Sequence, residues 1–118
     1  MSDDDDMDEV VAALRLQFLA ALPGHADAIR QVWRSLGGGE GTSARREAAG
    51  DLLRRAHRLA GGGAMVGLAA ISDAAAPVEE MLRAALESGE TLVLPAALAP
   101  LVARLLATCD AASGAEPV

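Results

Sequence analysis

The stretch that decides the fold runs from residue 52 to residue 67 and reads LLRRAHRLAGGGAMVG. Successive residues of an α-helix are rotated by about 100°, so Leu52, Ala56 and Leu59 fall on one apolar face of a helix. Charged residues occupy the other face, a division typical of a helix that packs on one side against a core. The same period of apolar residues recurs on both sides of the stretch, which predicts a chain of amphipathic helices.

The composition of the whole chain supports a helical fold. Hydrophobic residues make up 52% of the 118 residues and aromatic residues only 2%, namely Phe18 and Trp33. Alanine, the main apolar residue, is the best helix former, whereas strands favour aromatic and β-branched residues. We therefore expect an all-α domain that is large enough to bury one core.

Proline and glycine residues divide this pattern into separate helices. Pro77 either kinks its helix or restarts it, because proline lacks the backbone N–H. Short connections between such helices favour an antiparallel, up-and-down four-helix bundle, here with an additional short N-terminal helix. The expected helices lie before Pro23, at about 26–36, from 42 or 43 to about 65, from about 68 to 87, and from Pro95 onward.

The two ends of the chain differ in composition from the part between them. Residues 1–6 include a run of aspartates, and a run of like charge at a terminus usually stays solvated. Residues 112–118 hold Ser, Gly and Pro, which predicts a frayed tail. We expect a disordered acidic N-terminus over 1–6, a helical bundle over 7–111 and a frayed tail over 112–118.

The charge balance argues against several kinds of partner. The formal net charge is -7, from 17 acidic and 10 basic residues, and every base is Arg. Such a chain lacks the basic face that nucleic acids require, an apolar run of membrane-spanning length and a signal peptide. The single Cys109 cannot form an intramolecular disulfide, which fits a reducing compartment. We expect a cytoplasmic monomer that binds neither nucleic acid nor membranes and holds no metal.

His57 is the candidate functional residue. On a helical projection it falls about 140° from Leu52, at the edge of the apolar face. Arg54 and Arg58 follow it on the exposed side and place positive charge close to the ring. Gly61 lies one turn further on, where a larger side chain would lean over the imidazole. Together these residues predict an exposed nucleophilic nitrogen with room for an anionic group.

The residues around His57 resemble the motif of the histidine-containing phosphotransfer (HPt) domain family. In that family a His is followed by a basic or variable residue, an aliphatic residue, often Lys, and then Gly. The sequence departs from the pattern at Ala60, where Lys is frequent, at Gly62, where Ser or Thr is common, and at Pro77, inside a helix that is usually continuous. The matching residues are Ala56, His57, Arg58, Leu59, Gly61, the small pair Gly62–Gly63, and the pair Val66–Gly67.

The resemblance implies a phosphocarrier with a four-helix bundle fold. His57 would accept a phosphoryl group on Nε2 from the aspartate of a response-regulator receiver domain, and return it to such a domain. Arg54, Arg58, Gly61, Gly62 and Met65 would support the phosphoryl group or the docked partner. The chain would bind no cofactor, because the receiver domain would supply Mg²⁺ and the catalytic groups. A hybrid histidine kinase is the second expected partner.

Two other interpretations stay open from the sequence. The chain could be an HPt-like scaffold that binds a receiver domain or a kinase without exchanging phosphate, or a domain cut from a larger kinase, although the Met1 start favours a standalone protein. The remaining candidate residues favour ordinary structural roles. We expect His25 on the surface, Trp33 and Cys109 packed in the core, and the aspartates at 3–6 solvated.

Overall fold

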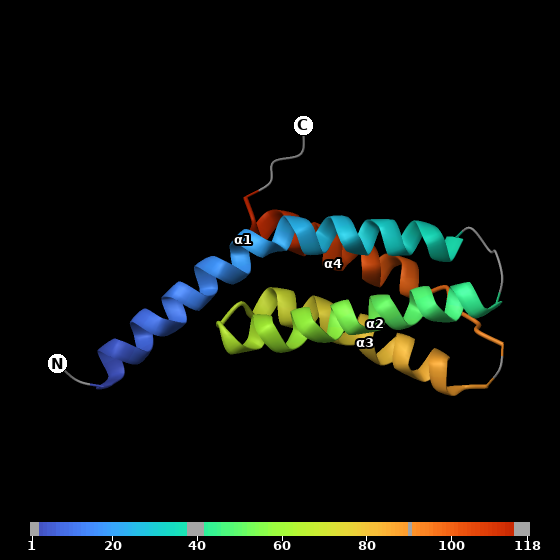
Figure 1. The fold of residues 1–118 in the computed structure, drawn as a ribbon, viewed down its shortest axis with the longest axis horizontal. Coiled ribbons are helices and arrows are strands. Elements are labelled where there is room, and N and C mark those ends of the chain that lie inside the picture. The colour runs from blue at the N-terminus through green and yellow to red at the C-terminus, as the bar shows by residue number, and fades with distance from the viewer. Residues whose placement is uncertain (1–2, 38–41, 90, 115–118) are drawn as a thin grey trace.

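The chain folds into four helices and has no strand among the residues that the structure describes, which are 3–37, 42–89 and 91–114. The structure is a computed structural model, and its fold is shown in Figure 1. The all-helical prediction is therefore confirmed. The helices are α1 (Asp3–Gly37), α2 (Thr42–Met65), α3 (Ala69–Glu87) and α4 (Leu98–Ala112).

The four helices form a bundle in which each helix runs back alongside the preceding one (Figure 1). Helix α1 contacts both α2 and α4, and α3 contacts the same two helices, so the four surround one core. Polar contacts join the helices at their edges. Arg30 of α1 donates to Asp110 of α4 at 2.6 Å, and Arg46 of α2 donates to the Leu86 carbonyl of α3 at 3.2 Å.

The core is built from aliphatic side chains and alanines, as the composition predicts. Cys109 is buried among them, and burial raises the pKa of its thiol to about 11. The thiol is therefore protonated at neutral pH and serves as a small apolar group. The largest fully buried side chains are Leu22, Ile29, Leu52, Leu59, Ile71, Val78, Leu82, Leu98, Val102, Leu105 and Cys109.

The turn between α2 and α3 ends α2 where the sequence predicts. Gly67 has a φ of +78°, a left-handed conformation that favours glycine. The Leu68 N–H donates to the Gly63 carbonyl at 2.8 Å, and the Gly67 N–H donates to the Ala64 carbonyl at 3.3 Å. These two bonds form a Schellman motif, which satisfies carbonyls at the end of α2. A Cβ on Gly63 would lie 3.2 Å from backbone atoms of Leu68 and Ser72, so this glycine allows the close approach of α3.

The expected separate N-terminal helix is not observed, because α1 continues through Pro23 as one helix of 35 residues. Figure 1 shows the helix changing direction near this point, as helices commonly do at proline. Proline removes its own N–H donor and its ring crowds the carbonyl four residues earlier, and burial of Leu22 and Ala26 on either side of it offsets that cost. Helix α3 likewise continues through Pro77 without restarting.

The boundaries of the helices differ from the expected ones at two places. Residues 3–6 belong to α1, since carboxylates near a helix N-terminus are stabilised by the helix dipole. Helix α4 begins at Leu98, not at Pro95, whose carbonyl accepts a turn hydrogen bond from the Leu98 N–H. Of the two expected disordered ends, residues 1–2 and 115–118 lie outside the described part of the chain.

None of the described helices is both long and apolar enough to span a lipid bilayer.

Candidate functional site

His57 lies on α2 with 70% of its side chain exposed. Its helix is held in place by Ala56 and Leu59, which are fully buried on either side of it in the sequence. The backbone that carries the imidazole is therefore fixed by the core, while the ring itself reaches solvent. This is the arrangement that the helical projection predicts.

Glu79 of α3 holds the imidazole in one orientation. The Nδ1–H of His57 donates a hydrogen bond to Oε1 of Glu79, whose side chain is only 12% exposed. A hydrogen bond at one ring nitrogen decides which nitrogen carries the proton in the neutral ring. With the proton on Nδ1, the lone pair available for reaction lies on Nε2.

Arg83 of α3 shares the same carboxylate. Its Nη2 lies 3.4 Å from Glu79 Oε1, one helical turn away on the same helix. Glu79 is the buried charged residue of the described chain, and a buried carboxylate is costly unless it is paired. Here the pairing is supplied by Arg83 and by the imidazole.

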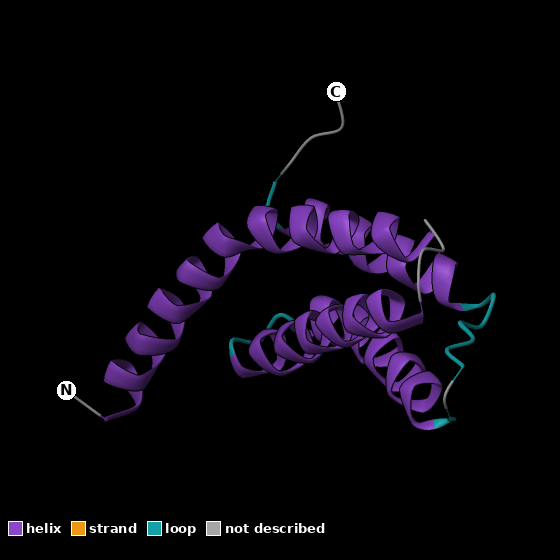
Figure 2. Ribbon diagram, turned by 45° about the vertical axis from the view of Figure 1, so that its right-hand side comes forward, coloured by secondary structure: helices purple, strands orange, loops and turns teal. Residues whose placement is uncertain are grey.

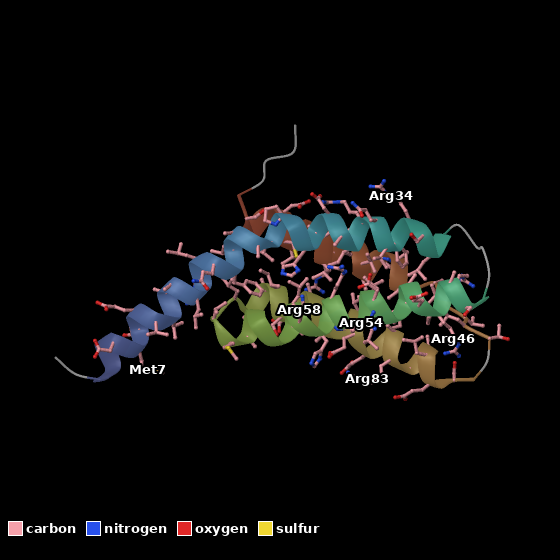
Figure 3. The ribbon with its side chains drawn as sticks, in the orientation of Figure 1. Met7, Arg34, Arg46, Arg54, Arg58 and Arg83 are labelled. Atoms are coloured by element: carbon pink, nitrogen blue, oxygen red, sulfur yellow. The ribbon has the colours of Figure 1, made fainter. Side chains whose placement is uncertain are left out.

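A cationic depression surrounds the exposed ring. It has a volume of about 470 Å³ and is lined by Leu53, Arg54, His57, Arg58 and Arg83. Figure 3 shows Arg54 and Arg58 on α2 and Arg83 on α3, away from Arg34 and Arg46 near the other end of the bundle. Within the described residues, Arg54 and Arg58 have no carboxylate at ion-pair distance. Their charges are available to an anion that approaches the ring.

Two other predicted residues continue this surface along α2. A Cβ built on Gly61 would meet nothing within 4 Å, so the space one turn beyond His57 is open. Met65, one turn further, is 75% exposed. The structure thus brings Arg54, Arg58, Gly61 and Met65 to the exposed side of α2 that carries His57.

Gly62 does not belong to this surface. A Cβ on Gly62 would lie 2.7 Å from the Phe18 ring of α1, so the glycine allows α1 to pack closely on α2. The contact gives Gly62 a packing role, and its expected role beside the phosphoryl group stays a prediction. Arg55 is also separate from the depression, because it pairs with Asp51 at 3.0 Å.

Comparison with known families agrees with the geometry around His57. The Hpt domain family matches residues 13–114, which includes all four helices except the first turns of α1. The chain belongs to the Hpt domain family. Comparisons with curated proteins and with solved structures gave no significant match.

Family membership gives the chain its general role. Hpt domains take part in phosphotransfer in two-component signalling, as phosphocarriers and not as enzymes. They interact with receiver domains and histidine kinases. The resemblance drawn from residues 56–67 is thus confirmed at the level of the family.

Glu79 and Arg83 are the residues beside His57 that the sequence analysis missed. Glu79 lies four residues after Ala75 and three before Leu82, both of which are buried, so it stands on the apolar face of α3. A carboxylate in such a position needs a partner, and that signal could have singled it out. Arg83, four residues later, is the expected helical partner for an acid.

The structure places no candidate metal site beside His57 in the part of the chain that it describes. No group of three or more His, Cys, Asp and Glu side chains is placed there to hold an ion. Glu79 is paired with His57 and Arg83, and Asp51, which precedes His57 on α2, is paired with Arg55.

The second histidine of the Hpt domain, His25 of α1, is partly buried. Burial first, and then the charges of Arg58 and Arg55, lower its pKa below 6.5. The unfolded chain therefore binds this proton at a higher pH than the folded chain does. His25 therefore leaves the free energy of unfolding unchanged above about pH 6.5. Below that pH the free energy of unfolding decreases, until the pH reaches the pKa of His25 in the folded chain.

We predict that His25→Gln flattens the decrease of stability on acidification. The free energy of unfolding, measured by urea denaturation on both sides of pH 6.5, should fall more steeply with acid in the wild type than in the variant. Both proteins keep His57, so the difference between them isolates His25. Equal slopes in the two proteins would contradict the assignment.

Proposed function

We propose that this Hpt domain carries a phosphoryl group on Nε2 of His57 in a cytoplasmic phosphorelay. It would accept the group from the aspartyl phosphate of one receiver domain and donate it to the aspartate of another. The observation that carries the proposal is the pairing of Nδ1 with Glu79, which leaves Nε2 as the reactive nitrogen. The cationic depression around the ring provides the matching surroundings.

The transfer step follows from the state of the ring. The Nε2 lone pair attacks phosphorus, a P–N bond forms, and the P–O bond to the partner aspartate breaks, so the carboxylate leaves with the electron pair. No general base is needed because the proton already resides on Nδ1. The phosphorylated ring becomes cationic, and the Glu79 carboxylate at Nδ1 offsets that charge. The reverse step returns the phosphoryl group to an aspartate.

The arginines contribute by electrostatics. Charge spreads over the equatorial oxygens of the transferred phosphoryl group in the transition state. Arg54 and Arg58 line the same depression as His57, where they can approach those oxygens. The receiver domain would supply Mg²⁺ and the remaining catalytic groups, as the resemblance to the family implies.

The docked partner would cover the exposed side of α2. Arg54, Arg58, Gly61 and Met65 lie on that side with His57. A receiver active site is acidic where it holds its aspartate and metal, so the local positive charge favours it within a chain of net charge -7. A hybrid histidine kinase, through its own receiver domain, would dock on the same surface.

The proposal is tested by incubating the chain with phosphorylated receiver domains. Label should move to the chain in a form that acid releases and alkali preserves, as expected of a phosphohistidine, and peptide mapping should place it on His57. A scaffold that only binds would take up no label, and its His57→Ala variant would bind partners and support signalling normally. Those two results together would reject the proposal that the chain is a phosphocarrier and would favour the scaffold interpretation.

Gly61→Leu should slow the transfer at least about tenfold, because a displacement of the reacting groups by about 1 Å can cost on the order of 100-fold. The leucine side chain leans towards the preceding turn and would cover the imidazole. Gly61→Ala is the matched control, since its Cβ meets no atom within 4 Å and should leave transfer close to wild type. Equal transfer rates for the Leu and Ala variants, measured with the same phosphorylated receiver, would refute the steric argument.

A further inference from the structure

The first part of α1 projects beyond the rest of the bundle. We call residues 3–17 the arm, because Phe18 is the first residue of α1 that packs against the core. Figure 1 and Figure 2 both show the arm diverging from the end of the α2–α3 hairpin. Near the start of the bundle, Arg15 Nε donates a hydrogen bond from the arm to the Val66 carbonyl at the end of the hairpin, at 2.8 Å.

The arm carries an apolar stripe that is mostly exposed, with Val11 the one partly buried member. Met7, Val10, Val11 and Leu14 follow the spacing of one helical face, and four residues later the stripe enters the bundle at Phe18. Met7 is 62% exposed and Leu14 is 41% exposed. Helices in proteins are stabilised mainly by packing of such a face, and a contiguous exposed apolar surface marks an interaction site.

The charges of the arm are separated along its length. Asp6, Asp8 and Glu9 lie at its exposed N-terminal end, and the next base along the chain is Arg15, at the other end of the arm. Among the described residues, none of these four groups has an ion-pair partner. The arm is thus acidic at one end and basic at the other.

We propose that the arm pairs with the arm of a second copy of this chain, in an antiparallel, two-fold symmetric dimer. In that orientation each apolar stripe covers the other, and the acidic end of each arm approaches Arg15 of its partner. A parallel pair would bring the two acidic ends together and would be repelled. A two-fold interface must be self-complementary, and a helix with an apolar stripe between opposite charges meets that condition.

A second copy fits the arm better than a receiver domain does. The positive charge that suits an acidic receiver active site lies at Arg54, Arg58 and Arg83, whereas the free end of the arm is acidic. The proposed interface also leaves His57 outside the paired residues. Dimerisation is therefore independent of the proposed phosphotransfer, and the sequence-based expectation of a monomer would be replaced.

The dimer is tested by sedimentation velocity on the full chain over a concentration series. The wild type should show a concentration-dependent monomer–dimer equilibrium. Leu14→Glu should raise the dimer dissociation constant at least about 100-fold, because the buried apolar side chain is lost from both copies. Met7→Glu, at the other end of the stripe, should have an effect in the same direction.

Leu16→Glu is the matched control. Leu16 is 69% exposed but lies on the face of the arm opposite Met7, so this variant should dimerise like the wild type. His57→Gln should also dimerise normally, which separates the dimer from phosphotransfer. A wild type that stays monomeric throughout, or a dimer weakened equally by Leu14→Glu and Leu16→Glu, would overturn the proposal. A monomer whose Leu14→Glu variant binds a receiver domain less tightly would assign the arm to that partner instead.

Discussion

His57→Gln is expected to abolish phosphate uptake from a phosphorylated receiver domain while leaving the fold intact. Glutamine has no nitrogen with a free lone pair, so no P–N bond can form. Its amide N–H groups can still donate to Glu79, and the replaced ring is 70% exposed, so little buried surface is lost. Helicity measured by circular dichroism, and the free energy of unfolding, should stay close to wild type.

His25→Gln provides the control for that experiment, because His25 is the other histidine of the chain. Under the same conditions it should take up label at the wild-type rate. Acid-labile label that persists in His57→Gln would show that another residue accepts the phosphoryl group, and the assignment of His57 would fail. A loss of label in both variants would point to a general effect of removing a histidine.

Glu79→Ala is expected to slow phosphotransfer by about tenfold to a hundredfold, by analogy with the range seen when a group that orients a metal-bound histidine is removed. Without the carboxylate, the ring can rotate and its proton can move to Nε2, which removes the reactive lone pair. The positive charge of the phosphorylated ring also loses its partner. Arg83, which shares Glu79 in the wild type, would then add repulsion near the ring.

Glu79→Gln separates the two contributions of this positioning residue. The amide oxygen can still accept from Nδ1–H, but it carries no charge, so the transfer rate should lie between those of the wild type and Glu79→Ala. Nitrogen NMR of the imidazole should show the Nδ1–H form dominating in the wild type and giving way to a mixture in Glu79→Ala. An unchanged tautomer together with an unchanged rate would mean that Glu79 serves only to pair Arg83.

The sequence predicts the helical class and the location of His57 because both depend on local periodicity. The expected start of α2 at residue 42 or 43 agrees with its observed start at Thr42, and Gly67 accounts for its end. Glu79 was missed because it is 22 residues from His57, and its role depends on how α3 packs against α2. Periodicity within one helix does not show which neighbour faces each side.

Gly62 and Pro23 illustrate how tertiary packing changes the meaning of a residue. Three consecutive glycines that follow His57 suggest that all three serve the same role beside the ring. In the structure, however, each glycine has different neighbours. Gly61 faces open space, Gly62 meets Phe18, and Gly63 meets the start of α3. At Pro23 the local rule predicts a break, but the buried residues on either side hold the two segments in one helix.

The single reactive nitrogen on one exposed side of α2 limits the rate at which phosphoryl groups can pass through the proposed relay. A donor and an acceptor must occupy the same side of the helix to reach Nε2, so they exclude each other. The loaded domain must release its donor before it can meet an acceptor, and the lifetime of each complex then limits the flux. Tight binding to either partner would slow the relay as a whole, which favours brief encounters at this surface over a stable assembly.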